Sequence, residues 1–201
     1  MAVAIILKSP EFNDTVTEKK VIYADAAYKF ADRLKDKTVL GVVGDFDSLQ
    51  HIPKEEKIVL LDEEKDFTDG ERAVIYAKEC GEKEIVIYGA YGGKIEHILG
   101  NIALLKIAKE NGLKAAIKSG GCVTELLGAG KHRFAIKAKS RVSLIPYGGD
   151  CVFGKSSGLY YPLDNLTLTT ADTRGISNVS ETFEISFDIL KGEALIIYEK
   201  D

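Results

Sequence analysis

Short apolar runs alternate with helical segments through the first part of this chain, and that alternation restricts the folds it can adopt. The runs are Val3–Leu7, Val21–Ala24, Val39–Val43, Ile58–Leu61, Ile85–Tyr88 and Ala115–Lys118. Between them, apolar residues recur at helical spacing in Tyr28–Lys35, Asp69–Cys80 and Glu96–Asn111. Strands that alternate with helices form βαβ units. The sequence therefore predicts an α/β domain with a mostly parallel, Rossmann-like sheet.

The pattern changes after about Leu127, where Gly128-Ala129-Gly130 is typical of a linker. The apolar runs that follow are short and alternating: Phe134–Ala138, Val142–Pro146, Leu159–Tyr161, Leu166–Thr169, Phe183–Phe187 and Leu195–Tyr198. Within one of them, Phe183, Ile185 and Phe187 would share one side of a strand. We therefore expect an α/β domain over residues 1–127 and a smaller all-β domain over residues 128–201, a sandwich or a barrel.

Composition excludes several classes of protein. The 201 residues carry a net charge of −4, whereas a nucleic-acid surface is normally basic. No apolar run approaches the roughly 18 residues of a membrane span, and the first residues resemble a strand rather than a signal peptide. Cys80, Cys122 and Cys151 form no C-x-x-C pair, which favours reduced thiols in the core of a cytoplasmic protein. We expect neither nucleic acid nor membrane as a partner.

Two carboxylates follow the third predicted strand, in Gly44-Asp45-Phe46-Asp47-Ser48. In open α/β sheets, ligands bind at the carboxyl ends of the strands. Crowded carboxylates repel one another unless a cation joins them, and Mg²⁺ takes oxygen ligands while also holding substrate phosphates. Taken alone, the D-x-D pattern fits a helix cap beside a solvated residue equally well.

Further aspartates follow neighbouring strands. Asp25 closes the second strand, where it could also cap the next helix. Asp69 lies in the first turn of a helix that Thr68 and Glu71 would cap, which explains it without a function. Asp66 lies before that cap and has no such explanation. Convergence of these aspartates would favour a divalent metal, but it depends on a strand order that the sequence leaves open.

A glycine-rich loop, Gly89–His97, joins the fifth predicted strand to a helix. Such loops let backbone N–H groups approach a phosphate, and the helix N-terminus favours an anion. Lys94 would add a positive charge, although a tight turn is the simpler interpretation. His97 is a candidate general base or a polar surface residue. Asn101 falls on the same helix face and could satisfy a buried backbone group.

Four motifs, in this order and spacing, resemble thiamine pyrophosphokinase: GDFDSL at 44–49, DFTD at 66–69, GAYGGKIEHILGN at 89–101 and GISN at 175–178. The resemblance covers nearly the whole chain. It implies an N-terminal domain that binds ATP and Mg²⁺, a C-terminal β domain that helps to bind thiamine, and a homodimer with sites at its interface. The implied reaction moves the β,γ-diphosphate of ATP onto the thiamine hydroxyl and releases AMP.

The resemblance also implies roles for particular residues. Asp45, Asp47 and Asp69 would be metal ligands and, with Glu96, catalytic carboxylates. The remaining implied contacts with ATP or thiamine are Asp25, Asp66, Gly92, Gly93, Lys94, His97, Ser177 and Asn178. Asp69 and Glu96 are both candidates for the general base, and the sequence does not choose between them.

The chain departs from the family pattern at three points. Asp25-Ala26-Ala27 stands where the family usually has Asp-Gly-Gly, and the added Cβ atoms restrict close approach to a ligand. Lys94-Ile95-Glu96 replaces Arg-x-Asp, which keeps the charge but loses the bidentate fork. The chain has no Trp, and Tyr161 is the nearest replacement.

Two other functions remain open from the sequence. One is a phosphatase that uses Asp45 as nucleophile and Asp47 as acid, since D-x-D-S after a strand suits that chemistry. The other is a nucleotide or thiamine sensor that retains the pockets without the chemistry, which the departures at Ala26-Ala27 and Glu96 would allow.

Overall fold

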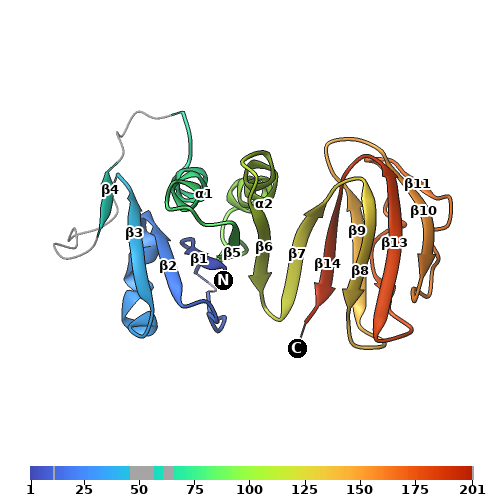
Figure 1. The fold of residues 1–201 in the computed structure, drawn as a ribbon, viewed down its shortest axis with the longest axis horizontal. Coiled ribbons are helices and arrows are strands. Elements are labelled where there is room, and N and C mark those ends of the chain that lie inside the picture. The colour runs from blue at the N-terminus through green and yellow to red at the C-terminus, as the bar shows by residue number, and fades with distance from the viewer. Residues whose placement is uncertain (11, 46–56, 61–65, 201) are drawn as a thin grey trace. The chain divides into compact units, whose positions relative to one another are not determined.

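The computed structural model describes residues 1–10, 12–45, 57–60 and 66–200. The chain divides into two compact units, Met1–Gly120 and Gly121–Asp201. The first unit carries strands and helices in alternation, and the second carries strands (Figure 1). The mixed α/β class of the first part and the separate antiparallel β part are both confirmed.

The first unit contains every element that the sequence predicts for it. Its strands are β1 (Val3–Ile6), β2 (Lys20–Ala24), β3 (Thr38–Gly44), β4 (Ile58–Leu60), β5 (Glu84–Tyr88) and β6 (Lys114–Ser119). Its helices are the 3₁₀-helix η1 (Asp25–Leu34), α1 (Asp69–Glu79) and α2 (Ile95–Glu110). The strands lie in the order β6-β5-β1-β2-β3-β4, and each neighbouring pair is parallel.

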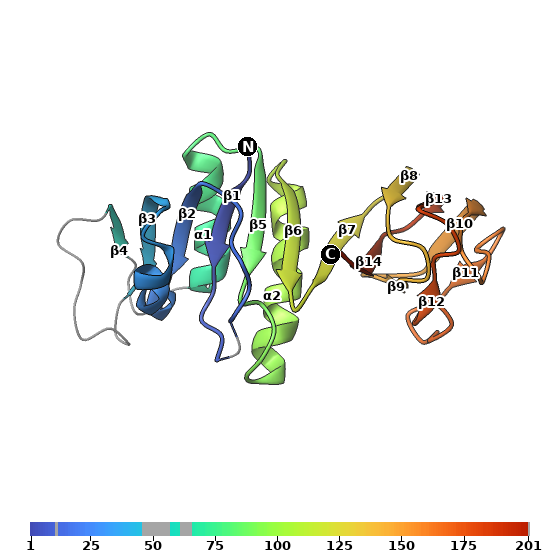
Figure 2. The ribbon, with the colours of Figure 1, turned by 90° about the horizontal axis from the view of Figure 1, so that it is seen from below.

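Both faces of this sheet are covered, which explains why its strands are nearly continuous apolar runs. On one face, alternate residues such as Ala4, Ile6 and Tyr23 join a buried cluster with Phe12 and with Ala27 of η1. Helices α1 and α2 lie on the other face (Figure 2), where α1 packs on β1, β2 and β3. Ile5, which points to that face, is fully buried.

The strand order decides what meets at the carboxyl edge. Because β5, β1, β2 and β3 are adjacent and parallel, the segments that follow them leave the sheet at the same edge. These segments are Leu7–Lys19 after β1, Asp25 at the start of η1, Asp45 after β3, and the Gly89–Lys94 loop before α2. Aspartates that are far apart in sequence are therefore brought together.

The second unit is built from two antiparallel sheets. One has the order β12-β9-β14-β7 and the other β11-β10-β13-β8. The strands are β7 (Cys122–Leu127), β8 (Gly130–Ala135), β9 (Arg141–Pro146), β10 (Cys151–Ser157), β11 (Thr167–Leu168), β12 (Asn178–Val179), β13 (Glu184–Lys191) and β14 (Ala194–Glu199). The ring of Phe134 on β8 lies 5.5 Å from that of Tyr198 on β14, so the two sheets face each other as a sandwich.

The structure differs from the sequence expectations in several places within this unit. Residues 122–127 form β7, which pairs with β14, so the division between the units falls at Gly120 and not after Leu127. Leu159–Tyr161 is not a strand, because Leu159 makes a single bridge to Ser180. Phe183 precedes β13 and is 74% exposed, whereas Ile185 and Phe187 are buried, so the prediction that the three share one side of a strand is wrong for Phe183.

The cysteines differ in burial. Cys151 is buried as expected, and burial raises the pKa of its thiol to about 11. Cys80 is exposed, contrary to the expectation that all three thiols lie in the core, and none of the three forms a disulfide.

Over the described ranges, no helix combines the length and the hydrophobicity that crossing a membrane requires.

Candidate functional site

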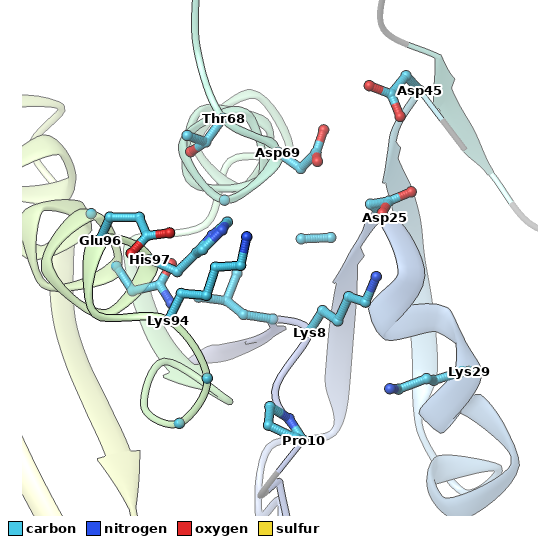
Figure 3. A pocket seen from close by; sticks show the side chains of 17 residues that line it. Lys8, Pro10, Asp25, Lys29, Asp45, Thr68, Asp69, Lys94, Glu96 and His97 are labelled. Carbon is cyan, nitrogen blue, oxygen red and sulfur yellow. The ribbon is translucent and has the colours of Figure 1, made fainter. Parts of the chain in front are cut away.

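A pocket of about 770 Å³ lies at the carboxyl edge of the first unit's sheet (Figure 3). The segments after β1, β2, β3 and β5 and the first turns of α1 and α2 supply its walls. Its described lining residues are Leu7, Lys8, Pro10, Ala24, Asp25, Lys29, Asp45, Thr68, Asp69, Gly70, Gly92, Gly93, Lys94, Glu96, His97, Gly100 and Asn101. The volume is in the usual range for a small-molecule site.

Three aspartates from three separate segments line one side of this pocket. Asp25 opens η1, Asp45 follows β3, and Asp69 opens α1. Figure 3 shows them on the side formed by η1, β3 and α1, with Lys94 and His97 on the side of α2. Carboxylate oxygens gathered in this way suit a hard divalent cation.

Asp25 has an unusual backbone and an unusual side chain. Its φ of 44° is positive, and its Oδ1 is buried with no hydrogen-bond partner among the described residues. The residue does not cap η1, since Ala24 occupies the N-cap position. Gly44 allows its close approach, because a Cβ there would lie 2.9 Å from the Cα of Asp25. A buried carboxylate oxygen without a partner is costly, which fits a site that binds a cation.

Asp69 is positioned by the start of α1. The backbone N–H of Glu71 donates to Oγ1 of Thr68 at 3.2 Å, which confirms Thr68 as the predicted N-cap. Asp69 is then the first helical residue, where the helix dipole favours a negative side chain. Gly70 allows this turn to lie close to α2, because a Cβ there would lie 3.1 Å from Cδ1 of Leu104.

The glycine loop between β5 and α2 is fitted closely to its surroundings. A Cβ at Gly89 would collide with the carbonyl oxygen of Leu7. Gly92 and Gly93 have φ values of 90° and 81°, in the region that favours glycine. The side-chain amide of Asn101 donates to the carbonyl oxygen of Ala90 at 2.9 Å, which confirms its predicted role on a backbone group.

Basic side chains enter the same pocket. Lys94 is the N-cap residue of α2, but its side chain makes no cap hydrogen bond with any described residue and extends into the pocket (Figure 3). Lys8, Lys29 and His97 also line the pocket. Lys29 lies on η1 beside the acidic side and Lys8 lies between the two sides, whereas Lys94 and the first turn of α2 form a side that suits an anion such as a phosphate.

The structure thus brings together most of the site residues expected from the sequence: Asp25, Asp45, Asp69, Gly92, Gly93, Lys94, Glu96 and His97. Asp66 is exposed and is not among the described residues of the pocket wall. Asp47 lies outside the described residues. Sequence reasoning missed Lys8 and Lys29, although Lys8 follows a strand just as Asp45 does.

The two remaining candidates, Ser177 and Asn178, lie in the second unit. Asn178 is buried, and its side chain is bonded to the backbone of Tyr161, accepting from its N–H at 3.0 Å and donating to its carbonyl at 2.8 Å. Ser177 has a φ of 59°, and its N–H donates to Oγ of Ser143. Asn178 therefore fixes the backbone of Tyr161, a residue that is 60% exposed.

No group of three or more His, Cys, Asp or Glu side chains within the described ranges is close enough to hold a metal ion by itself. Asp25 and Asp45 nevertheless present oxygen ligands at the same edge, and one oxygen of Asp25 is buried without a partner. Oxygen donors fit Mg²⁺, which also takes substrate phosphate oxygens as ligands. These residues therefore fit a magnesium ion that would take its other ligands from a bound phosphate.

Comparison with known proteins decides the family. A family model described as "Thiamin pyrophosphokinase, catalytic domain" matches residues 14–117, and "Thiamin pyrophosphokinase, vitamin B1 binding domain" matches residues 131–190. Thiamine pyrophosphokinase of Bacillus subtilis is 30% identical over 165 residues, which cover 79% of this chain and 77% of the relative. This chain belongs to the thiamin pyrophosphokinase family.

Solved structures of family members share the fold. The crystal structure of thiamine pyrophosphokinase from Bacillus subtilis aligns with a TM-score of 0.86 at 24% identity, over 100% of both chains. The enzyme from Candida albicans aligns with a TM-score of 0.77 at 16% identity, over 100% of this chain and 90% of the other. The α/β part followed by an antiparallel β part is thus the fold of this family.

Proposed function

We propose that this protein transfers the diphosphate group of ATP to the hydroxyl of thiamine, giving thiamine diphosphate and AMP. Membership of the thiamin pyrophosphokinase family supports the reaction. The observation that carries the assignment to a site is the pocket at the sheet edge, where Asp25, Asp45 and Asp69 face a glycine loop and Lys94. The parallel-paired first unit serves in this proposal as a Rossmann-like nucleotide-binding domain.

Asp45 and Asp69 would hold Mg²⁺ together with Asp25, and Asp47 is predicted to join them. When bound, the ion supplies positive charge to the phosphate oxygens. The three described carboxylates come from separate segments that the sheet holds in place, so they are oriented before the ligand arrives. Ordering these groups in advance lowers the cost of binding a highly charged ligand.

Gly92, Gly93 and Lys94 would bind the phosphate chain of ATP. The two glycines turn the loop with positive φ and leave its backbone uncovered by side chains, so N–H groups can approach an anion. Lys94 extends its ammonium group into the same space (Figure 3). Its positive charge offsets part of the phosphate charge, although it lacks the planar fork of an arginine.

The chemical step is an in-line displacement. The thiamine oxygen bonds to the β-phosphorus, the bond from that phosphorus to the oxygen it shares with the α-phosphate breaks, and AMP leaves with that oxygen. The hydroxyl proton passes to a carboxylate of the pocket, Asp69 or Glu96. Most of the rate of such a transfer comes from positioning and charge stabilisation.

Thiamine recognition is proposed for the second unit, whose residues 131–190 match the vitamin B1 binding model of the family. Tyr161 is exposed, and Asn178, the first residue of β12, holds its backbone, with Ser177 directly before it. An exposed aromatic face suits the flat, cationic ring system of thiamine. A homodimer with sites at its interface, a contact from Asp66 and a cytoplasmic location remain predictions.

One assay tests the reaction. The protein, Mg²⁺ and ATP are incubated with and without thiamine, and AMP and thiamine diphosphate are both quantified. We expect equal amounts of the two products, formed only with thiamine and Mg²⁺. Binding of ATP without any AMP would indicate a sensor, and a trapped aspartyl-phosphate would indicate a phosphatase. The family membership favours neither of these alternatives.

A further inference from the structure

Lys8 is a pocket residue that neither the motifs nor the family models cover. It follows β1, a strand in the interior of the sheet, and lines the pocket at the carboxyl edge. The catalytic-domain model matches residues 14–117, so the segment that carries Lys8 lies outside it. Figure 3 shows the side chain of Lys8 rising into the pocket between the acidic side and Lys94.

The backbone that carries Lys8 is fixed on both sides. The N–H of Leu7 donates to the carbonyl of Tyr88 at 2.9 Å, which extends the pairing of β1 with β5. The hydroxyl of Ser9, which is 1% exposed, donates to the carbonyl oxygen of Tyr91 at 2.6 Å. The residue that follows Lys8 is therefore bonded directly to the glycine loop that is proposed to bind phosphate.

The far end of the same segment is also anchored. The N–H of Gly120 donates to Asp14 at 2.8 Å, and the guanidinium group of Arg33 donates to the carbonyl oxygen of Phe12 at 2.8 Å. Glu18 accepts from the hydroxyl of Tyr88 at 2.8 Å and pairs with Lys118 at 3.2 Å. The described parts of the segment between β1 and β2, residues 7–10 and 12–19, are thus anchored at several points; we call this segment the strap, and Lys8 has a defined position at its start.

The charge of Lys8 is not used within the described part of the protein. Other lysines have carboxylate partners, such as Lys20 with Glu82 at 2.7 Å, but Lys8 forms no ion pair with a described residue. Lys29, the third lysine of the pocket, packs its ammonium group 4.8 Å from the centroid of the Phe30 ring. Lys8 is therefore the lysine that, like Lys94, has its charge available to a ligand in this pocket.

We propose that Lys8 contacts the phosphate chain of bound ATP as a second ammonium group, opposite Lys94. This inference rests on the proposed function of the pocket. A triphosphate brings several negative charges to a wall that already holds three aspartates, so one lysine and a metal ion leave charge to be neutralised. Because Ser9 ties the strap to the glycine loop, Lys8 places a second positive charge near a phosphate that this loop would bind.

The test measures the affinity of the purified full-length protein for Mg-ATP and for adenosine by isothermal titration calorimetry. In Lys8→Met we expect the Kd for Mg-ATP to rise about tenfold, as for the loss of one charged contact. The Kd for adenosine should be unchanged, because adenosine has no phosphate. Lys8→Arg should stay close to wild type, and Lys19→Ala, an exposed lysine outside the pocket wall, is the matched control.

Two outcomes would overturn the inference. One is an unchanged Kd for Mg-ATP in Lys8→Met. The other is an equal rise in the Kd for adenosine, which would indicate general damage to the pocket. Failure of the proposed function is recognised separately, because a wild-type protein that binds Mg-ATP but forms no AMP with thiamine would contradict the reaction without affecting the role of Lys8 in binding.

Discussion

Two groups of charged side chains lie near the carboxyl edge of the same sheet, and they use their charges differently. In the first group, Glu18 is bonded to Tyr88 at 2.8 Å and to Lys118 at 3.2 Å, and the side chain of Glu18 is 7% exposed. In the second, Asp25, Asp45 and Asp69 share the wall of a pocket of about 770 Å³ with Lys8 and Lys94. The side chains of the first group are bonded to one another, and we call it the closed group. Those of the second group line a cavity, and we call it the open group.

The difference shows how the fold separates stability from binding. Burial by itself would raise the pKa of Glu18, but the hydrogen bond from Tyr88 and the Lys118 ammonium lower it below its ordinary value. Burial and the neighbouring carboxylate raise the pKa of Tyr88. These groups satisfy one another and hold the strap in place. In the pocket, by contrast, the buried Oδ1 of Asp25 has no described hydrogen-bond partner. This oxygen is therefore available to bind a ligand.

The largest effect that would sharpen this comparison comes from the open group. Asp45→Asn removes a negative charge proposed to hold Mg²⁺ while keeping the size of the side chain. We expect kcat for AMP formation to fall by at least about 100-fold, as for the loss of one electrostatic contact to the transition state. Circular dichroism and the melting temperature should stay close to wild type. Turnover near the wild-type value would contradict the proposed metal role.

The closed group should respond in stability. Glu18→Gln removes a buried charge-assisted bond, so we expect the free energy of unfolding to fall by about 1.5–3 kcal/mol at pH 7. The pKa of Glu18 is lowered from 4.5 in the folded protein, so its stabilisation is complete above that pH. It is lost as the pH falls through the lowered pKa.

The measurement is urea unfolding of wild type and Glu18→Gln between neutral and acidic pH. The difference in the free energy of unfolding between the two proteins should become smaller on acidification. A gap that is constant over the whole range would mean that the charge of Glu18 contributes nothing, and the contrast between the closed and open groups would fail.

The smallest effect concerns the bond between the strap and the glycine loop. Ser9→Ala deletes the hydrogen bond to Tyr91 and loosens the segment that carries Lys8. Since such a bond is worth on the order of 1 kcal/mol, we expect the KM for ATP to rise by about threefold to fivefold. The value of kcat should be unchanged. Thr15→Ala, at an exposed position of the same segment, is the control. An equal rise in the KM for ATP in that variant would mean that the Ser9 hydrogen bond has no specific role in ATP binding.

The elements of the first unit were predictable because its sheet is buried on both faces. Runs such as Val39–Val43 have no polar residue to obscure them, and β3 extends one residue beyond this run at each end. The start of α1 followed from the side-chain chemistry of Thr68. In the second unit, β10 was missed because Gly154, Lys155 and Ser156 interrupt its apolar pattern, where the pairing with β13 is irregular.

The candidate site was predictable as a set of strand ends but not as a pocket. Asp25 and Asp45 were found because each follows a buried strand. Their convergence depends on β1, β2 and β3 being neighbours, with β5 beside β1, and no local pattern encodes that order. Lys8 was missed because its segment matches no motif. The backbone of Asp25, with a positive φ beside Gly44, arises from tertiary packing.

The central claim is that aspartates at separate strand ends and helix starts act on a common phosphate ligand. The most direct measurement compares thiamine-dependent AMP formation by Asp69→Asn with that by Glu71→Gln. Both residues lie in the first turn of α1, but only Asp69 is among the described residues of the pocket wall. Both changes remove one negative charge from the same helix end, so they cost similar dipole energy.

The account predicts that Asp69→Asn lowers kcat by at least about 100-fold, whereas Glu71→Gln keeps kcat close to wild type. Similar activity in the two variants, either both active or both inactive, would contradict it.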